Sequence, residues 1–443
     1  METKLARIAE IAKTKPNEIF TSLAHLITKE LLLECHYRMD PTKAAGVDGV
    51  TWVEYDRDVP SRLENLVERL KKKAYRPMPV RRTYIPKAGS NKMRPLGIPA
   101  YEDKLVQKAM VEILNPIYEQ DFSNVSFGFR TGRGSLDALK VLNQLIEKGK
   151  TNYIVDADIK GFFDHVDHEH LMEFLKLRIA DPSILRLIAR FLKAGYMEAG
   201  TRYETGEGTP QGGIISPLLA NIYLHYVLDL WFMQVVRKHL KGKCYLVRYA
   251  DDFVCCFQHK EDAEKFYHVL IKRLEKYNLE IAEEKTKIIA FGKNAESQRQ
   301  QEGKGKPDTF DFLGFTHYCG KSRHGKFRVK RITCAKKYRA SLKRAKEWIK
   351  LNRTMPADKL VAHLNRKMQG YYHYYSITDN YHAVSRFRYQ VINALFKWLN
   401  RRSQRKSFER EKFQLFLKKF PVATPKVYVN IYDIKPGLTI GLW

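Results

Sequence analysis

The chain has 443 residues, of which 44% are hydrophobic and 12% aromatic, and this apolar content is enough to bury a folded core. Its 79 Lys and Arg residues against 49 Asp and Glu residues give a formal net charge of +30, which is typical of proteins that bind a polyanion such as nucleic acid. The lack of about 18 consecutive apolar residues disfavours a membrane span. The six cysteines lack the spacing of a disulfide scaffold or a zinc module, so we expect a cytoplasmic protein.

The positive charge is concentrated near the C-terminus. Residues 321–420 hold 28 Lys and Arg against five Asp and Glu, a net +23. Seven aromatic residues lie among these cations: Tyr371, Tyr372, Tyr374, Tyr375, Phe387, Tyr389 and Trp398. Aromatic rings and arginines on one surface bind bases and phosphates together, so we predict that nucleic acid lies against this part of the chain. The alternative is a solvated helical surface.

Apolar spacing predicts a mixed α+β chain. In chain order, helices are predicted over residues 5–34, 59–73, 104–118, 136–148, 216–228 and most of 335–417, and extended segments over 79–87, 153–159 and 244–257. The last segment has the pattern of a strand, a tight turn and a second strand. Ser216 is the predicted N-cap of its helix, with Pro217 as the first helical residue.

Two adjacent carboxylates, Asp251 and Asp252, lie at the turn predicted within residues 244–257. Like charges raise each other's pKa, and a bound divalent cation removes the repulsion. Asp158 would reach the same place if its strand were a neighbour in one sheet. Mg²⁺ takes such oxygen ligands, and two ions would activate a hydroxyl and stabilise a leaving phosphate oxygen. Turn chemistry without a metal is the alternative interpretation.

Two further segments carry groups suited to a phosphorylated ligand. Residues 206–213 form a glycine-dense loop around Gln211, in which the backbone would approach a ligand closely. Residues 85–99 have the pattern of two strands around a loop that presents Lys87 and Arg94. Two such cations would neutralise a triphosphate.

Three histidines, His165, His168 and His170, lie on either side of Asp167. A transition-metal site is one interpretation. We favour the other, in which Asp167 caps a helix that begins at His168 and runs to about residue 177.

Eight motifs occur in an order that is found in one family. They are Gly-Val-Asp-Gly at 46–49, Ile-Pro-Lys…Arg-Pro-Leu-Gly-Ile-Pro at 85–99, Ser-Phe-Gly-Phe-Arg at 126–130, Val-Asp-Ala-Asp…Phe-Phe-Asp at 155–164, Gly-Thr-Pro-Gln-Gly-Gly at 208–213, Tyr-Ala-Asp-Asp at 249–252, Glu-Lys-Thr-Lys at 284–287 and Phe-Leu-Gly-Phe at 312–315. With them the chain resembles the reverse-transcriptase domain of bacterial group II intron-encoded proteins (intron maturases). The resemblance runs from about residue 46 to 315, and more loosely to about 420.

The resemblance implies an α+β right-hand polymerase with fingers, palm and thumb. It implies that Asp158, Asp251 and Asp252 are the catalytic, metal-binding carboxylates, that the Ile159 carbonyl is a further metal ligand, and that Mg²⁺ is the cofactor. It divides the chain into fingers and palm over residues 1–320, a helical thumb or maturase region over 321–405, and a short basic tail over 406–443, with no HNH endonuclease expected.

The same resemblance implies a site for deoxynucleoside triphosphates. Lys87 and Arg94 would clamp the triphosphate, and Gln211 would line the nucleotide and template pocket. Phe163 matches the family's steric gate, a ring that excludes a ribose 2′-hydroxyl, although an ordinary core Phe is the alternative. Lys285 would approach the triphosphate as a charge or a proton donor.

Further cations are predicted to contact nucleic acid. Arg130 and Arg133, near a pair of glycines, would face a strand of it. A basic cluster after the helical region would bind RNA or DNA; it consists of Arg401, Arg402, Arg405 and Lys406.

The sequence thus predicts the RNA-directed DNA polymerase of a group II intron, which extends a DNA primer on an RNA template and binds intron RNA to assist splicing and mobility. Two alternatives stay open. One is a splicing-only RNA-binding maturase, and the other is a domesticated reverse transcriptase of antiviral defence or CRISPR spacer acquisition. A viral RNA-dependent RNA polymerase is disfavoured because Phe163 would exclude ribonucleotides.

Overall fold

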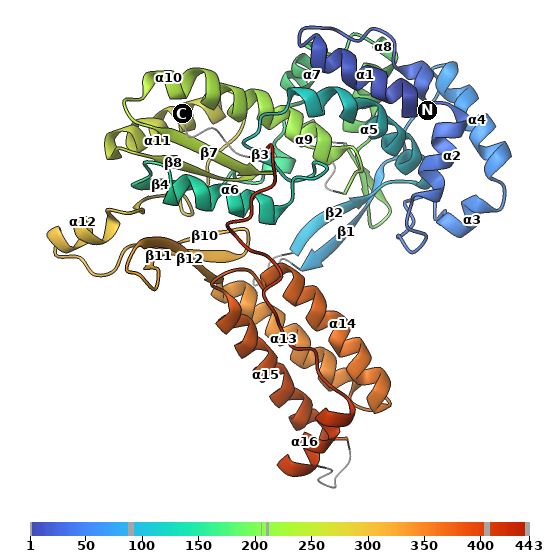
Figure 1. The fold of residues 1–443 in the computed structure, drawn as a ribbon. Helices are drawn as coiled ribbons and strands as arrows, with labels where there is room; N and C mark the ends of the chain where they lie inside the picture. The colour runs from blue at the N-terminus through green and yellow to red at the C-terminus, as the bar shows by residue number, and fades with distance from the viewer. Residues whose placement is uncertain (1, 87–92, 205, 210–211, 403–407, 439–443) are drawn as a thin grey trace.

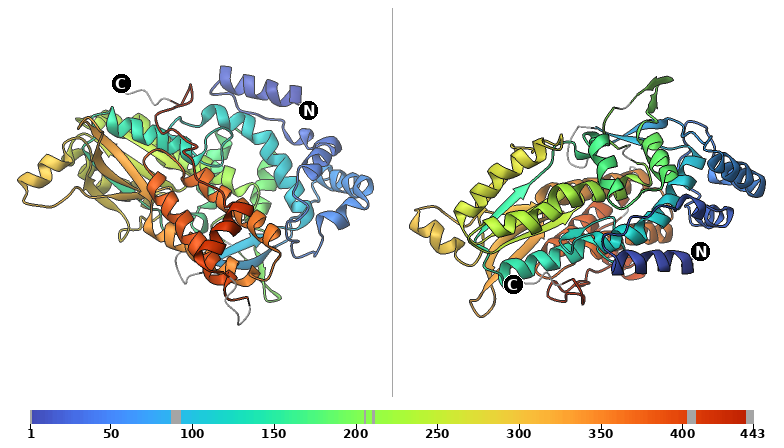
Figure 2. Two further views of the ribbon diagram at one scale, coloured as in Figure 1. Left: turned by 60° about the horizontal axis from the view of Figure 1, so that its bottom comes forward. Right: turned by 90° about the horizontal axis from the view of Figure 1, so that it is seen from above.

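A computed structural model of the chain describes residues 2–86, 93–204, 206–209, 212–402 and 408–438 (Figure 1). These residues form two bodies, each with its own buried hydrophobic core. The larger body contains the sheets, and the smaller body is a bundle of helices that projects from one side of it (Figure 1, Figure 2). The mixed α+β class predicted from the sequence is confirmed.

Helices near the N-terminus pack around one long helix. They are α1 (Glu2–Thr14), α2 (Lys29–Tyr37), α3 (Trp52–Asp56), α4 (Val59–Lys71) and the long α5 (Tyr101–Asp121). The single helix predicted over residues 5–34 is wrong, because Pro16 follows the end of α1 and cannot continue it. The break is held by Asp181, whose carboxylate accepts hydrogen bonds from the backbone of Leu23 and Ala24 at 2.6 and 2.7 Å.

A four-stranded sheet lies beside these helices. Its order is β2 (Met93–Ile98), β1 (Val80–Pro86), β5 (Tyr196–Glu198) and β6 (Thr201–Tyr203). The helices α7 (His168–Lys176) and α8 (Pro182–Leu192) precede the β5–β6 hairpin. Asp167 caps α7 by accepting a hydrogen bond from the backbone of His170, so the capping interpretation of the histidine cluster is confirmed.

The central sheet has five strands in the order β3 (Ser126–Phe127), β7 (Cys244–Tyr249), β8 (Asp252–Phe257), β4 (Tyr153–Ala157) and β9 (Lys287–Ala290). β3 is parallel to β7, and the other neighbours are antiparallel. Helix α6 (Ser135–Glu147) packs on β7, and α11 (Lys260–Glu275) packs on β4 and β8. The predicted strand pair is therefore the β7–β8 hairpin, and the predicted strand of Asp158 is its neighbour.

One long helix is apolar enough to cross a membrane by length and composition. It runs from Ser216 to His239 through α9 (Ser216–Leu224), the π-helical turns η3 (His225–Asp229) and η4 (Phe232–Val236), and α10 (Arg237–His239). Because 67% of its most apolar window is buried inside the protein, its apolarity is that of a core helix. The helix starts at Ser216, with Ile215 rather than Ser216 as the N-cap.

A second small sheet leads into the helical bundle. Its strands are β10 (Phe310–Phe312), β11 (Phe315–Lys321) and β12 (Phe327–Thr333), and the short α12 (Ala295–Gln301) precedes them. The predicted boundary at residue 321 falls inside the β11–β12 hairpin, where Lys321 pairs with Phe327. The helical body instead begins with α13 (Ala335–Asn352).

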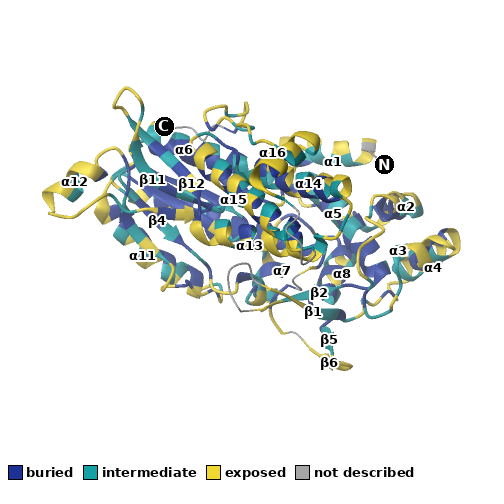
Figure 3. Ribbon diagram, turned by 90° about the horizontal axis from the view of Figure 1, so that it is seen from below, coloured by how far each residue is buried: buried dark blue, intermediate teal, exposed yellow. Residues whose placement is uncertain are grey.

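The bundle consists of α13, α14 (Ala357–Tyr375), α15 (Tyr381–Leu399) and α16 (Arg410–Lys419). Its outer faces are exposed and its interior is buried (Figure 3). After α16 the chain returns along the bundle to the larger body, where Val429 pairs with Ile377 and Ile431 joins the larger core (Figure 1). The segment predicted as a tail therefore connects both bodies.

Candidate active site

Strand pairing brings three predicted carboxylates to one end of the central sheet. Ala157, the last residue of β4, lies opposite Phe253 of β8. Asp158 follows Ala157 and Asp252 precedes Phe253, so the antiparallel register brings the two carboxyl-bearing residues to the same level. Asp251 lies in the tight turn between Tyr249 and Asp252, which pair with each other.

The turn that carries Asp251 has a strained backbone, and a neighbouring segment of the chain stabilises it. Ala250 has a φ of 56°, in the left-handed region that non-glycine residues avoid at a cost of about 1–2 kcal/mol. Its N–H donates to the carbonyl of Phe127 at 3.0 Å. Gly128 makes this approach possible, because a Cβ there would lie 3.0 Å from the Ala250 nitrogen.

A buried ion pair supports the same turn, and the sequence analysis missed it. Arg248 and Asp229 are both fully buried, and the guanidinium donates to both carboxylate oxygens at 2.7 and 2.5 Å. Arg248 also donates to the Ala250 carbonyl at 2.9 Å, to Ser126 Oγ at 2.7 Å and to Asn221 Oδ1 at 3.1 Å. The available signal was an arginine inside an otherwise apolar strand, since buried charges need partners.

The carboxylates crowd negative charge at this end of the sheet. Asp252 keeps contact with solvent, yet the enclosing protein and the charges of Asp251 and Asp158 raise its pKa to about 6. Burial also raises the pKa of Asp251, an effect that the charge of Arg94 opposes. Asp156 lies in β4, two residues before Asp158. Burial and the charge of Asp252 raise the pKa of Asp156 to about 7. The concentration of negative charge therefore favours the binding of a cation at this site.

Lys285 supplies one positive charge. Its ammonium is hydrogen-bonded and ion-paired to Asp158, and this bond raises the pKa of Lys285. Lys285 was predicted to approach a triphosphate. In the structure its ammonium contacts the carboxylate of Asp158. The pair joins segments 127 residues apart, which no local pattern could indicate.

The fit of a metal ion depends on which oxygen atoms converge here. Among the residues that the structure describes, no three His, Cys, Asp or Glu side chains lie close enough together to hold a metal ion. The donor set at the sheet end is nevertheless of the oxygen type that Mg²⁺ prefers. Ile159 pairs with Ile281 through hydrogen bonds that use the Lys160 N–H and the Asp158 carbonyl, so this pairing leaves the Ile159 carbonyl unused. The donors match Mg²⁺ in type, and the metal ligands inferred from the resemblance stay a prediction.

Replacing Asp252 with Asn should stabilise the metal-free protein progressively as the pH rises. The folded state raises the pKa of Asp252 from 3.8 to about 6, so the fold loses stability as the carboxyl gives up its proton over this pH range, whereas Asn has no proton to lose. We expect the melting temperature of Asp252→Asn to match wild type near pH 4 and to exceed it by about 1–3 °C at pH 8. Calorimetry in EDTA would measure this, and a difference independent of pH would contradict the raised pKa.

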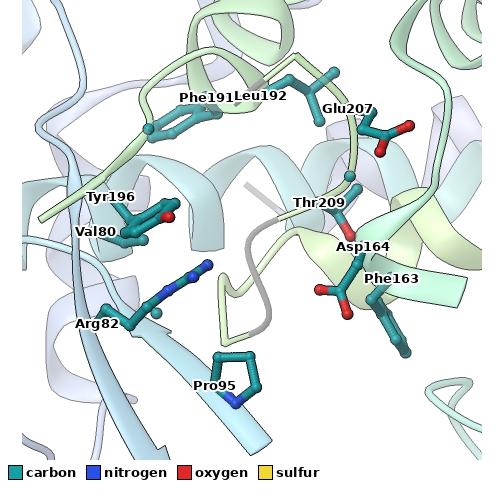
Figure 4. A pocket seen from close by; sticks show the side chains of 13 residues that line it. Val80, Arg82, Pro95, Phe163, Asp164, Phe191, Leu192, Tyr196, Glu207 and Thr209 are labelled. Carbon is teal, nitrogen blue, oxygen red and sulfur yellow. The ribbon is translucent and has the colours of Figure 1, made fainter. Parts of the chain in front are cut away.

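Phe163, one of the predicted nucleotide-binding residues, lies at a pocket of about 330 Å³ (Figure 4). Phe163, half-buried beside Phe162, lines it together with Asp164, Gly208 and Thr209. The opposite wall comes from β1, β2 and β5 and includes Arg82, Pro95 and Tyr196, with the Arg82 guanidinium 3.4 Å from the centre of the Tyr196 ring. The prediction for Phe163 is thus compatible with its location.

Arg94 is exposed on β2, and its charge acts on Asp251, so the cation predicted to bind triphosphate faces the carboxylates. Lys87 and Gln211 lie outside the described residues.

A groove of about 1100 Å³ separates the larger body from the bundle. Asp252 and Asp311 line it on one side, and cations of the bundle line it on the other: Lys336, Lys337, Arg344 and Lys367. The positive C-terminal region thus faces the carboxylates across an open groove. Its dimensions and charge suit a nucleic-acid strand.

The predicted aromatic surface is only partly present. Tyr371, Tyr374 and Tyr375 line the groove together with Phe387, which is largely buried, but Tyr372 is buried in the bundle core. Tyr389 is 65% exposed, elsewhere on α15. Trp398 is half-buried with the cations Lys350, Lys397 and Arg401 near its ring.

Arg130, which was predicted to contact nucleic acid, is buried and bonded within the protein. Its side chain is 2% exposed and donates to Glu119 at 3.0 Å and to the carbonyls of Ser123 and Ser126. Arg133 is half-buried and donates to Asn124 Oδ1 at 2.6 Å, which leaves its predicted role untested.

The basic cluster near residue 401 is described in part. Arg401 is exposed, whereas Arg402 is half-buried and donates to the Met355 carbonyl at 3.1 Å. Arg405 and Lys406 lie outside the described residues.

Comparisons with known proteins agree with this arrangement. Residues 85–317, more than half of the chain, match the model of reverse transcriptase (RNA-dependent DNA polymerase), and residues 338–416 match the maturase-specific domain of group II introns. The first match contains the carboxylates, and the second coincides with the helical bundle. The fold, the site and these matches define the class of the chain as a reverse transcriptase.

Comparison with individual relatives shows which kind of reverse transcriptase the chain is similar to. The group II intron-encoded protein LtrA of Lactococcus lactis subsp. cremoris is 42% identical over 235 residues, which are 53% of this chain and 39% of LtrA. Protein YkfC of Escherichia coli is 34% identical over 357 residues, 73% of this chain and 90% of YkfC. Nuclear intron maturase 4, mitochondrial, of Arabidopsis thaliana is 30% identical over 146 residues, 32% of this chain and 18% of that protein. The chain belongs to the family of group II intron-encoded reverse transcriptases and maturases.

Proposed function

We propose that the protein is an RNA-directed DNA polymerase that extends a DNA primer on an RNA template and binds intron RNA to assist splicing and mobility. The observation that carries this proposal is the meeting of Asp158, Asp251 and Asp252 at one sheet end, beside a groove whose far wall is basic. The family supports the same activity, although the matched segment spans 39% of the length of LtrA.

In this proposal the two bodies correspond to the parts of a right-hand polymerase. The five-stranded sheet would be the palm, and the β1–β2 sheet with the N-terminal helices would be the fingers. The bundle would be the thumb. The groove between sheet and bundle would hold the template–primer duplex, with Lys336, Lys337 and Arg344 near its phosphates.

The reaction joins the primer 3′-oxygen to the α-phosphorus of a deoxynucleoside triphosphate and breaks its bond to pyrophosphate, which leaves. Asp158, Asp251 and Asp252, with the Ile159 carbonyl, would hold Mg²⁺, and the bound ion would supply the positive charge that lowers the pKa of the attacking hydroxyl and neutralises the leaving oxygen. Arg94 and Lys87 would neutralise the triphosphate, while Gln211 would contact the base pair. Lys285 would exchange Asp158 for the triphosphate and protonate the leaving pyrophosphate.

Primer extension on an RNA template, with deoxy- and ribonucleotides compared, tests the proposal. We expect deoxynucleotide-dependent extension that requires Mg²⁺. In Phe163→Ala the preference for deoxynucleotides should fall by about 10–100-fold, because the ring no longer collides with the 2′-hydroxyl. Ratios of kcat/KM for the two substrates measure this, and wild-type protein that binds RNA but extends no primer would contradict the proposal.

A splicing-only maturase is the second candidate. The maturase-specific region has its own hydrophobic core and its own basic face, so RNA binding is separable from the carboxylates. Splicing by a variant with Asp158, Asp251 and Asp252 all changed to Asn would show whether the two functions are independent.

A further inference from the structure

The loop that contains Gly208 and Thr209 is docked along the segment that carries Phe163. The Thr209 N–H donates to the Phe163 carbonyl at 2.8 Å, and the Gly208 N–H donates to the Val166 carbonyl at 2.8 Å. Gly208 has a φ of 84°, and a Cβ there would lie 2.8 Å from the Asp164 carbonyl oxygen. The two backbones are therefore in direct contact, and the position of one fixes the other.

His168 holds this loop from its other side. Its Nε2 lies 2.6 Å from the Gly208 carbonyl oxygen, which accepts only, so Nε2 carries the donated hydrogen. His168 is the first residue of α7, whose start is fixed by the Asp167 cap. Asp167 is in turn bound by Asn278 Nδ2 at 2.8 Å. The imidazole thus projects from an anchored helix end onto the loop.

The docked segments form one wall of the pocket. Phe163, Gly208 and Thr209 line it on this side, facing Arg82 and Pro95 (Figure 4). A shift of Gly208 would move the Thr209 N–H that holds the Phe163 carbonyl, and with it the base of the Phe163 side chain. The clearance between the ring and a nucleotide sugar depends on such a shift, because the ring would exclude a 2′-hydroxyl by direct collision.

We propose that His168 is a positioning residue for sugar selection, which acts through Gly208 and Thr209 on Phe163 and does not touch the substrate. This inference rests on the proposed function. Of the three histidines near Asp167, His168 is the one whose ring is bonded to the backbone of the loop. The His165 ring is paired with the side chain of Glu207, at 3.3 Å, so its loss leaves the backbone contacts of Gly208 and Thr209 in place.

The test compares His168→Leu, His168→Gln and His165→Leu in primer extension with deoxy- and ribonucleotides. His168→Leu lacks the donor and should lower the deoxy-to-ribo ratio of kcat/KM by about tenfold, the value of one hydrogen bond. The amide of His168→Gln restores a donor and should keep the ratio within about threefold of wild type. His165→Leu should leave the ratio unchanged.

A purely structural role for His168 predicts a different result. Both substrates would then lose activity equally and the ratio would stay constant, which would overturn the inference. If His168→Leu does not fold, His168→Asn, whose shorter amide cannot reach the Gly208 oxygen, gives the same comparison. Phe163→Ala is measured in parallel. A lower ratio in Phe163→Ala with an unchanged ratio in His168→Leu overturns this inference alone, whereas wild-type protein without any extension overturns the proposed function and this inference together.

Discussion

Asp251→Asn is expected to lower the rate of primer extension by at least about 10³-fold while the affinity for RNA stays within about twofold of wild type. The substitution keeps the size of the side chain and removes one carboxylate from the proposed metal-binding set. In the proposed function RNA binds in the basic groove, in which Lys336, Lys337 and Arg344 keep their charges. Single-turnover extension and filter binding measure the two quantities separately.

The same variant gives a readout that does not depend on activity. A divalent cation bound to the folded state raises its melting temperature, so Mg²⁺ should stabilise wild type and should stabilise Asp251→Asn much less. Asp58→Asn is the matched control, because Asp58 is exposed at the start of α4 and makes no side-chain capping hydrogen bond. Equal extension by Asp251→Asn and Asp58→Asn would refute the catalytic assignment.

The hairpin of Asp251 could be predicted because its signal is local. Two runs of β-forming residues around two adjacent charges specify a strand, a turn and a strand, and the alternation of side chains specifies the face. The same reasoning identified β4, since Tyr153–Ala157 is short, apolar and followed by a glycine turn. That β4 and β8 are neighbours follows from the family pattern and is confirmed by their register.

The positions of the arginines could not be predicted in the same way. Arg130 is paired with Glu119, which lies in the preceding helix. The residues between them do not indicate that the chain folds back to bring the two side chains together. Arg248 and Asp229 are 19 residues apart on a strand and a π-helical turn, so no helical or strand spacing links them. A buried charge reveals that a partner exists, but the partner is specified only by the tertiary fold.

For the aromatic residues of the bundle, in contrast, burial could be predicted from the sequence. Leu364, Met368 and Tyr372 recur at four-residue spacing in α14, and all three are buried. This spacing marks the face of a helix that packs against its neighbours. Composition alone grouped Tyr372 with the surface cations, whereas helical periodicity assigns it to the core.

Arg248→Met is expected to destabilise the protein by about 3–5 kcal/mol, the cost of leaving one member of a buried ion pair without its partner. Asp229 is fully buried, and it would lose the guanidinium that donates to both of its carboxylate oxygens, with His225 Nδ1 left at 4.0 Å. Ser126, Asn221 and the Ala250 carbonyl would lose a donor at the same time. Unfolding in urea, followed by far-ultraviolet circular dichroism, measures the loss.

The double variant Arg248→Met/Asp229→Leu separates stability from positioning. With both charges removed, most of the lost stability should return, to within about 1–2 kcal/mol of wild type, since an apolar pair of similar volume needs no compensation. Extension should stay at least about tenfold below wild type, because the Ala250 carbonyl still lacks its donor and Ala250 must keep a φ of 56° without that support. If the double variant regains full activity together with its stability, Arg248 contributes to the fold alone. If stability returns and activity does not, the buried arginine serves to hold the turn that presents Asp251.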